Sequence, residues 1–214
     1  MTEQLQPAEE QIGVFLLPLV LLPFDELALH ATNRRHSEMI ADLRRNNSEE
    51  FGIIYVDRNS ESGIAKRALV GTVAHLEMAS PYTHGRWSLI VRGERRFRVL
   101  RWEHDDPYPV AMIESLPDAA LPQPNALSDD AEAAVRRVRR LLADLGDAST
   151  ATTDLTPADD PVAWSWQLCA AAPLNANDQQ QLLEIDDPKQ RLRLLISLMD
   201  ALYGDFAPLG QGPS

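Results

Sequence analysis

The feature that most constrains this chain is a change of hydrophobic period across a cluster of prolines, which contains Pro117, Pro122 and Pro124. Before the cluster, apolar residues alternate with polar ones or form short continuous runs, which is typical of β-strands. After the cluster, apolar residues recur at the spacing of amphipathic helices. A run of strands followed by a run of helices predicts an α+β fold, and the prolines mark the boundary between its two parts.

Strand signals dominate the first part of the chain. The clearest covers Trp87–Leu100, in which apolar and polar residues alternate and Gly93 allows a bulge or a bend. A single helix interrupts the strands over Arg34–Arg45, where apolar residues share one face. Further apolar segments bounded by turn residues predict strands over residues 14–17, 19–22, 27–30, 51–56, 69–78 and 110–116.

Helix signals dominate the second part, and most of them begin at a residue that can cap a helix. Ser128 can cap a long apolar stripe that Gly146 ends. Three more helices are expected to begin at Asp160-Pro161, at Asn175 or Asn177, and at Asp187-Pro188. Together these signals predict a β-rich domain over residues 12–118, a helical bundle over residues 119–206, and flexible tails over residues 1–11 and 207–214.

The composition disfavours several classes of function. The chain has 214 residues and carries 32 Asp and Glu against 20 Lys and Arg, a net charge of −12. This excess of acid disfavours binding to duplex nucleic acid, which basic surfaces recognise, and docking on anionic lipid. The single cysteine, Cys169, excludes an internal disulfide. We expect a cytoplasmic protein with no membrane segment, because no basic signal region precedes the first apolar run and that run is too short to span a bilayer.

Motifs for catalysis, for phosphate binding and for metal binding are absent from the sequence. It contains no glycine-rich phosphate loop, no serine nucleophile elbow and no His-Glu-x-x-His pair. A stretch from Asp57 to Glu61 resembles the start of a calcium loop, but Gly63 falls one place late and Ala68 stands where a glutamate is needed. We therefore expect no enzyme activity, no cofactor and no bound metal.

The one basic concentration in the first part of the chain lies along its longest expected strand. Arg92, Arg96 and Arg98 share one parity and, with nearby aromatic residues, could form a strip that contacts nucleic acid. Arg95 and Arg101 have the opposite parity. Cross-strand ion pairs with acidic neighbours are the alternative explanation for these arginines.

Three stretches of the sequence occur in an order that is similar to that of a known family. Phe15–Pro23 reads F-L-L-P-L-V-L-L-P, residues 70–75 read V-G-T-V-A-H, and residues 91–100 read V-R-G-E-R-R-F-R-V-L before Asp106-Pro-Tyr108. They resemble the "LPL…LFP", "GT-apolar-A" and "G-x-x-R-F-R-V … D-P-Y" stretches of the substrate-binding domain at the N-terminus of Lon protease. Residues 161–203, which end in a Leu-rich helix, resemble the helical portion that continues this domain.

The resemblance implies a PUA-like pseudo-barrel of two small sheets and one helix, followed by the helical bundle. It implies a stand-alone bacterial member of the family, without the ATPase and protease domains that follow in Lon. Such a module would bind unfolded or exposed apolar polypeptide segments without processing them, as an adaptor or regulator of proteolysis, with a protease as a further partner. A PUA-like protein that binds RNA or a small molecule through Arg92–Arg101 is the alternative function.

Three aromatic residues that we place in loops, Phe24, Tyr82 and Tyr108, are the candidates for contacts with such a polypeptide. The alternative for each is an ordinary packing role. The physical basis of binding would be an apolar groove or strand addition to an exposed sheet edge. Residues 30–36 depart from the family's pattern in a region that lines the presumed groove, so no ligand preference is carried over from the family.

Overall fold

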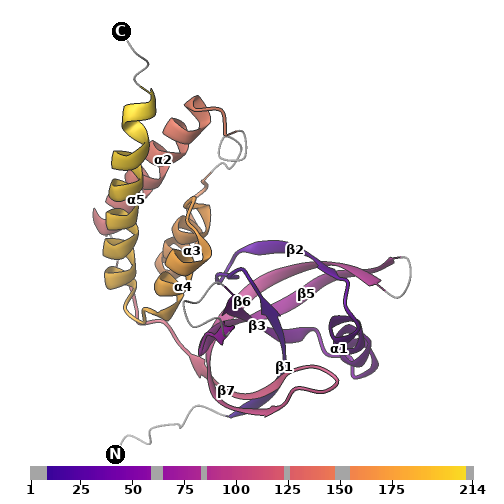
Figure 1. Ribbon diagram of the computed structural model, residues 1–214. Coiled ribbons are helices and arrows are strands. Elements are labelled where there is room, and N and C mark those ends of the chain that lie inside the picture. Colours follow the sequence, from indigo (N-terminus) through magenta and orange to yellow (C-terminus); the bar gives the residue numbers. More distant parts are fainter. Residues whose placement is uncertain (1–8, 59–64, 83–85, 123–125, 148–154, 211–214) are drawn as a thin grey trace, which may run out of the picture. The chain divides into compact units, whose positions relative to one another are not determined.

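Figure 1 shows the computed structural model, which describes residues 9–58, 65–82, 86–122, 126–147 and 155–210. The chain forms two compact units, Met1–Pro117 and Asp118–Ser214. Within the described residues, the first unit contains the strands and one helix, and the second contains only helices. The predicted α+β class, with strands before helices, is therefore confirmed. No helix in the described ranges is both long enough and apolar enough to cross a membrane.

The strands of the first unit close on one another to form a small barrel. Its elements are β1 (Glu10–Leu17), β2 (Glu26–Ala31), α1 (Arg34–Arg45), β3 (Glu50–Asp57), β4 (Lys66–Arg67), β5 (Val70–Tyr82), β6 (Arg86–His104) and β7 (Val110–Leu116). The hydrogen-bonded order is β1, β7, β6, β5, β3, and a parallel pairing of β3 with β1 closes the ring. This closure agrees with the expected pseudo-barrel and pairs strands that an open sheet would leave at its edges.

The long strand β6 divides its length between two small sheets. Its second half lies in the barrel, between β5 and β7. Its first half forms a second sheet with β2 on one side and the end of β5 on the other, so that Ile90 lies opposite both Ala28 and Met78. α1 packs on one face of this second sheet, and its residues Met39 and Ile40 are buried, as their spacing predicts.

The junction between the two sheets depends on Gly93. The pairing register of β5 and β6 shifts beside this residue, where the sequence predicts a bulge or a bend. The Gly93 N–H donates to the Asp25 carbonyl, and the Phe24 N–H donates to the Gly93 carbonyl, each at 2.8 Å. A Cβ atom at position 93 would lie 2.1 Å from the Leu22 carbonyl oxygen. This close approach therefore requires glycine.

Residues 19–22 form no strand, although their apolar run predicts one. They belong to a largely buried loop that is bounded by Pro18 and Pro23. The Leu21 carbonyl in this loop accepts a hydrogen bond from the Thr72 hydroxyl at 2.6 Å. Core burial, instead of strand pairing, explains why this run is apolar.

The ends of the folded region also differ from the sequence-based expectation. β1 begins at Glu10, inside the expected N-terminal tail, because Glu10–Gly13 pair with β7. α5 (Pro188–Gly210) continues beyond residue 206, so the expected C-terminal tail begins within a helix. The remaining tail residues, 1–8 and 211–214, lie outside the described part of the chain.

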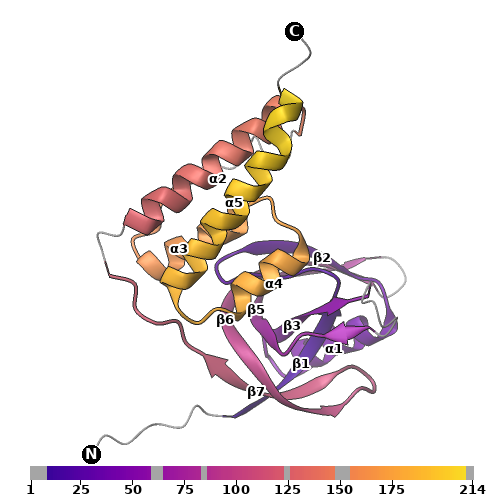
Figure 2. The ribbon, with the colours of Figure 1, turned by 60° about the vertical axis from the view of Figure 1, so that its left-hand side comes forward.

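The described helices of the second unit are α2 (Ala126–Asp144), α3 (Pro161–Ala171), α4 (Ala176–Glu184) and α5. α2 and α5 lie side by side and run in the same direction (Figures 1 and 2). Three expected caps are present, because the side chains of Asp160, Asn175 and Asp187 accept hydrogen bonds from N–H groups of the first turns of α3, α4 and α5. α2 begins at Ala126, so Ser128 lies within the helix and does not cap it.

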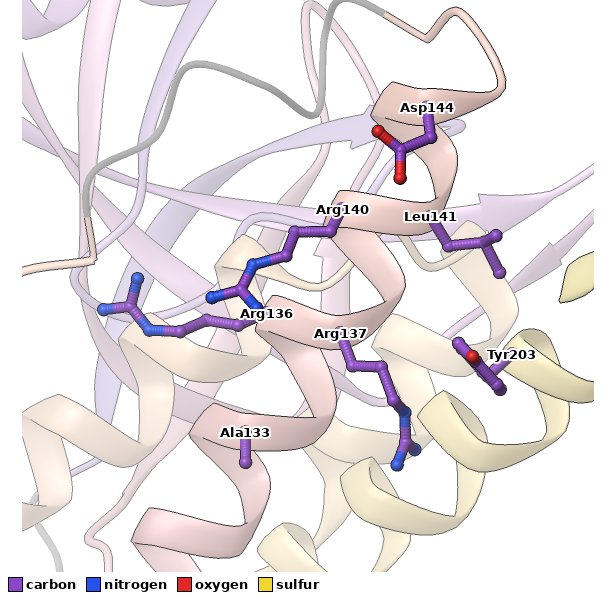
Figure 3. Close-up of a pocket in the computed structure, with 7 residues that line it drawn as sticks. All are labelled: Ala133, Arg136, Arg137, Arg140, Leu141, Asp144 and Tyr203. Carbon is purple, nitrogen blue, oxygen red and sulfur yellow. The ribbon is translucent and has the colours of Figure 1, made fainter. Parts of the chain in front are cut away.

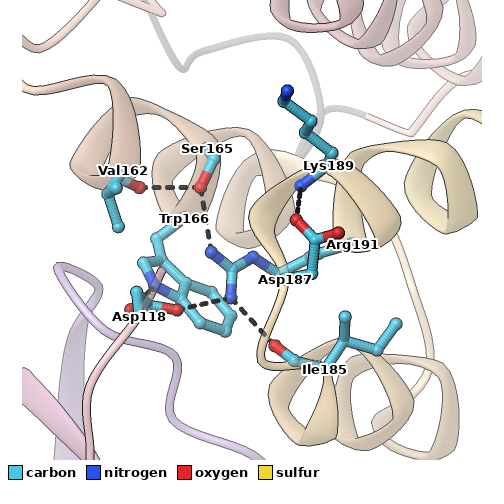
Figure 4. A network of polar contacts seen from close by, with 8 residues as sticks. All are labelled: Asp118, Val162, Ser165, Trp166, Ile185, Asp187, Lys189 and Arg191. Atoms are coloured by element: carbon cyan, nitrogen blue, oxygen red, sulfur yellow. Dashed lines mark hydrogen bonds and ion pairs between the residues drawn. The ribbon is translucent and has the colours of Figure 1, made fainter. Parts of the chain in front are cut away.

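A buried arginine ties together the helices of the second unit (Figure 4). Arg191 in α5 is fully buried, and its guanidinium donates to the Asp118 carboxylate at 2.8 Å and to the Ser165 hydroxyl at 3.2 Å. The Trp166 indole N–H donates to the other oxygen of the same carboxylate at 2.8 Å. The guanidinium also lies 3.4 Å from the centre of the Trp166 ring. This network joins the first residue of the unit to α3 and α5.

Candidate functional site

The three aromatic residues that are predicted to contact a polypeptide lie in three separate places. Phe24 adopts a φ of +63° in the turn beside Gly93 and is 46% exposed. Tyr82 is the last residue of β5 and not a loop residue, and it is 65% exposed. Tyr108 follows β6, and its half-buried hydroxyl donates to the Asp42 carboxylate in α1 at 2.9 Å. Phe24 and Tyr82 therefore remain open to a ligand, whereas Tyr108 is engaged within the unit.

The environment of Tyr108 defines what this residue does. Burial, together with the neighbouring Asp42 carboxylate, raises the pKa of Tyr108 to about 12. Its ring also packs against the core beneath α1. Tyr108 therefore holds the connection between β6 and β7 against α1, which is a packing role.

The arginine strip that is predicted on β6 does not form a single exposed row. Arg92 and Arg98 are exposed, but Arg96 is only 1% exposed. The register shift beside Gly93 interrupts the alternation along β6. An extra residue in a strand moves the side chains that follow it to the opposite face. Arg96 and Arg92, although separated by an even number of residues, therefore lie on different faces of β6.

Carboxylates lie against four arginines of β6. The pairs are Arg92 with Glu77 and Glu94, Arg95 with Glu10 and Glu50, Arg98 with Glu114, and Arg101 with Glu9 and Glu103, at N···O distances from 2.8 to 3.6 Å. Most of these pairs join neighbouring strands or segments of the barrel. These four guanidinium groups already have acidic partners, which agrees with the alternative explanation that they form cross-strand ion pairs.

An open groove lies where β2, α1 and β6 meet, and we call it the Trp87 groove. β2 ends at Ala31, directly opposite Trp87 on β6. The side chain of Asn33 then caps α1 by accepting a hydrogen bond from the His36 N–H at 2.8 Å. The space between these elements measures about 450 Å³ and is lined by Thr32, Asn33, Arg34, Ser37, Glu38, Ala41, Arg86 and Trp87.

The Trp87 groove combines an aromatic wall with a polar rim. Trp87 and Ala41 supply apolar surface, and Arg34 forms an ion pair with Glu38 at 2.7 Å along the rim. Behind the groove, His36 stacks on Phe15 with ring centres 4.1 Å apart. Burial lowers the pKa of His36 and so favours the neutral form of its ring. Trp87 was visible in the sequence only as a strand residue, because its position beside α1 depends on the fold.

A second hollow, which we call the β5 slot, lies at the other end of α1. It measures about 380 Å³ and is lined by Arg44, Asn47, Ser48, Glu49, Leu76, Glu77 and Ala79. The Arg44 guanidinium lies 5.2 Å from the centre of the Trp87 ring, so a residue that lines the β5 slot lies over the aromatic wall of the Trp87 groove. Met78, 53% exposed, lies on the adjoining part of β5. Open space, exposed apolar side chains and a strand edge thus occur together around α1.

The second unit has a pocket of its own, between α2 and α5 (Figure 3). It measures about 460 Å³. Arg137 forms an ion pair with Asp200 and lies 4.8 Å from the centre of the Tyr203 ring. Arg136 forms an ion pair with Glu132 at 2.7 Å. The pair of Arg137 with Asp200 joins α2 to α5, whereas the pair of Arg136 with Glu132 lies within α2.

Neither reactive thiol chemistry nor a metal centre is indicated by the described residues. Cys169 is fully buried, and burial raises the pKa of its thiol to about 12. A thiol with so high a pKa is a poor nucleophile at neutral pH. The described residues contain no group of three or more His, Cys, Asp or Glu side chains that could hold a metal ion.

The sequence matches a known family along nearly its whole length. Residues 13–201 match the substrate-binding domain of ATP-dependent protease La (LON). The chain belongs to this family. The resemblance inferred from the sequence motifs is therefore confirmed, and it extends through the helical unit as well as the barrel of this Lon substrate-binding domain.

Curated relatives of this Lon domain are much longer proteins. A Lon protease of Anaeromyxobacter dehalogenans is 27% identical over 193 residues, which cover 86% of this chain and 22% of that protein. Lon protease 2 of Myxococcus xanthus is 25% identical, over 86% of this chain and 23% of that protein. The chain thus spans about a fifth of the length of these relatives.

Solved structures share the fold of this Lon domain. A Lon N-terminal domain protein from Xanthomonas campestris is 25% identical and superposes with a TM-score of 0.63, covering 88% of this chain and 98% of that one. The N-terminal domain of a Mycobacterium avium complex Lon protease gives a TM-score of 0.62 at 19% identity, covering 89% and 98%. The α+β architecture described above is thus found in other Lon N-terminal domains.

Proposed function

We propose that this chain is a polypeptide-binding module, which takes up unfolded or extended segments that expose large apolar side chains. The observation that carries the proposal is the Trp87 groove, an open space with an aromatic wall in a member of the Lon substrate-binding domain family. We further propose that the module works in the cytoplasm, as an adaptor or regulator that brings bound segments to a protease.

The size and the lining of the Trp87 groove support this proposal. Its volume of about 450 Å³ lies within the range of ligand sites in proteins, and it is enough for a bulky side chain. Tryptophan gives large apolar contact area at a binding surface with little loss of conformational freedom. The polar rim formed by Arg34, Glu38 and Arg86 can pair with the main chain on either side of that bulky residue.

A substitution that fills the groove tests the proposal. Ala41 is exposed on α1 and lines the groove, so Ala41→Trp would occupy the space without disturbing the core. Ala201→Trp on the exposed face of α5 is the matched control. The probe is lysozyme that has been reduced and alkylated, which is unfolded and carries no acidic excess, with folded lysozyme as the comparison.

We expect the full chain to bind the unfolded lysozyme and not the folded form, in fluorescence anisotropy titrations. Ala41→Trp should weaken this binding about tenfold, the loss that follows when one buried apolar anchor is excluded. Ala201→Trp should bind like the unchanged chain. Equal binding by the two variants, with both still folded, would remove the Trp87 groove from the proposal. Absence of binding by the unchanged chain would remove polypeptide binding altogether.

A further inference from the structure

We propose that the polypeptide segment docks as an added β-strand along the free edge of β5, in the β5 slot. This inference rests on the proposed function and specifies how the segment is held. The bound segments would be extended and able to form a strand. The main chain of β5, as well as its side chains, would recognise them.

The free edge exists because β3 ends before β5 does. β5 pairs with β6 along its whole length, but it pairs with β3 only over Thr72–His75, where His75 lies opposite Glu50. The Leu76 N–H still donates to the Glu49 carbonyl at 2.7 Å. Beyond Leu76, no strand among the described residues pairs with the side of β5 that faces away from β6.

The β5 slot occupies the place where β3 would continue. Its lining residues Asn47, Ser48 and Glu49 form the chain that comes from α1 into β3, and Leu76, Glu77 and Ala79 belong to β5. Because the chain between α1 and β3 does not follow the line of β3, a space remains beside β5 where β3 would otherwise extend. An unpaired strand edge presents N–H and carbonyl groups that another extended chain can satisfy.

Pro81 limits the length of the added strand. Proline has no N–H to donate, and within sheets it is found at edges. The open stretch of β5 therefore runs over Glu77–Ser80, between the last bond to β3 and this proline. An added strand this short would bind a segment weakly. We therefore expect the same segment to contact the neighbouring Trp87 groove as well.

The side chains along β5 determine which segments fit. Met78 and Tyr82 lie on the exposed face, opposite Ile90 and Arg86 of β6. In an added strand, alternate residues would lie beside Met78, and apolar side chains there would gain cross-strand contact. Of the charged residues that line the slot, Glu49 and Glu77 outnumber Arg44, so the slot mildly disfavours acidic segments, although Glu77 is paired with Arg92. The expected occupant is a neutral or basic segment with apolar residues at alternate positions.

Main-chain methylation of a peptide tests strand addition directly. The probe is a fluorescein-labelled peptide of sequence Lys-Val-Thr-Val-Thr-Val-Lys, prepared unmodified, with N-methyl groups on its valines, or with N-methyl groups on its threonines. In an added strand, only alternate N–H groups face the partner strand. We expect one methylated form to lose about tenfold in affinity, because two or more hydrogen bonds are removed, and the other to bind like the unmodified peptide.

A pair of chain variants adds a second readout. Met78→Glu places a negative charge beside the expected strand, and Leu100→Glu, at an exposed position on β6, is the matched control. Met78→Glu should weaken binding of the peptide about fivefold, from lost cross-strand contact, and the control should have no effect. Strand addition is overturned if both methylated peptides bind alike, or if unfolded lysozyme binds while the peptide does not. Failure of unfolded lysozyme to bind would instead overturn the proposed function.

Discussion

The Arg191 guanidinium donates to the Asp118 carboxylate at 2.8 Å, although 73 residues separate the two along the chain. The Arg191 side chain is completely buried and the Asp118 side chain is 17% exposed. Charges removed from water in this way need a partner, because an uncompensated buried charge is strongly destabilising. The stability of the second unit therefore depends on Asp118, its first residue.

The first prediction concerns this pair. Asp118→Asn should lower the free energy of unfolding of the helical unit by about 3 kcal/mol, since it removes the carboxylate to which the buried Arg191 guanidinium donates. Asp200→Asn is the control, because its ion pair with Arg137 is half exposed and should contribute less than about 1 kcal/mol. Urea unfolding followed by the fluorescence of the chain's tryptophans checks both values. Similar losses for the two variants would contradict the assigned role of Asp118.

The second prediction concerns the hydroxyl of Tyr108. Tyr108→Phe should cost about 1 kcal/mol of stability, the net value of one hydrogen bond, here to Asp42. The pKa of Tyr108 is raised from 10.0 to about 12 in the folded chain. Because the folded pKa lies above the unfolded one, this contribution is complete below pH 10 and is lost as the pH rises through about 12.

Urea midpoints of the unchanged chain and of Tyr108→Phe, compared below pH 10 and again near pH 12, check this pH dependence. The difference between the two proteins should shrink as the pH rises across this window. A difference that stays constant would show that the Tyr108 hydroxyl ionises as it does in an unfolded chain.

The third prediction concerns the close approach at Gly93. Gly93→Ala should destabilise the first unit by about 2 to 3 kcal/mol, because the new Cβ would meet the Leu22 carbonyl and force the backbone to move. Gly204→Ala in α5 is the matched control, with nothing within 4 Å of the added atom. It should stabilise the helix by up to about 1 kcal/mol. Thermal unfolding measures both, and equal effects would argue against a steric requirement at Gly93.

The fourth prediction addresses the alternative function. We expect no binding of single-stranded RNA at low salt, because carboxylates partner four of the arginines from Arg92 to Arg101 that would form the strip and electrostatic attraction to phosphates needs unpaired cations. Filter-binding titrations over a range of salt concentrations check this. Tight binding with a steep salt dependence, lost in Arg92→Ala, would restore the nucleic-acid alternative.

Local features of this protein can be predicted from the sequence. The helix over Arg34–Arg45 has the bounds that its apolar spacing indicates, and α3 begins at Pro161 after the Asp160 cap. The alternation along 87–100 likewise indicates β6. Periodicity and capping involve residues that are close in the chain, so no knowledge of the rest of the fold is required. For the candidate site, the sequence singled out Phe24, Tyr82, Tyr108 and the stretch 30–36, and Thr32, Asn33 and Arg34 of that stretch line the Trp87 groove.

The sequence by itself thus determined the order of strands and helices, the family and most element boundaries. Only the tertiary structure decided that Arg96 is buried, that residues 19–22 are a core loop, and that Arg191 meets Asp118. It also decided that Trp87 borders a groove and that β5 has a free edge. These features depend on strand register and on contacts between residues far apart in the chain, and a one-residue register shift is enough to exchange the two faces of a strand.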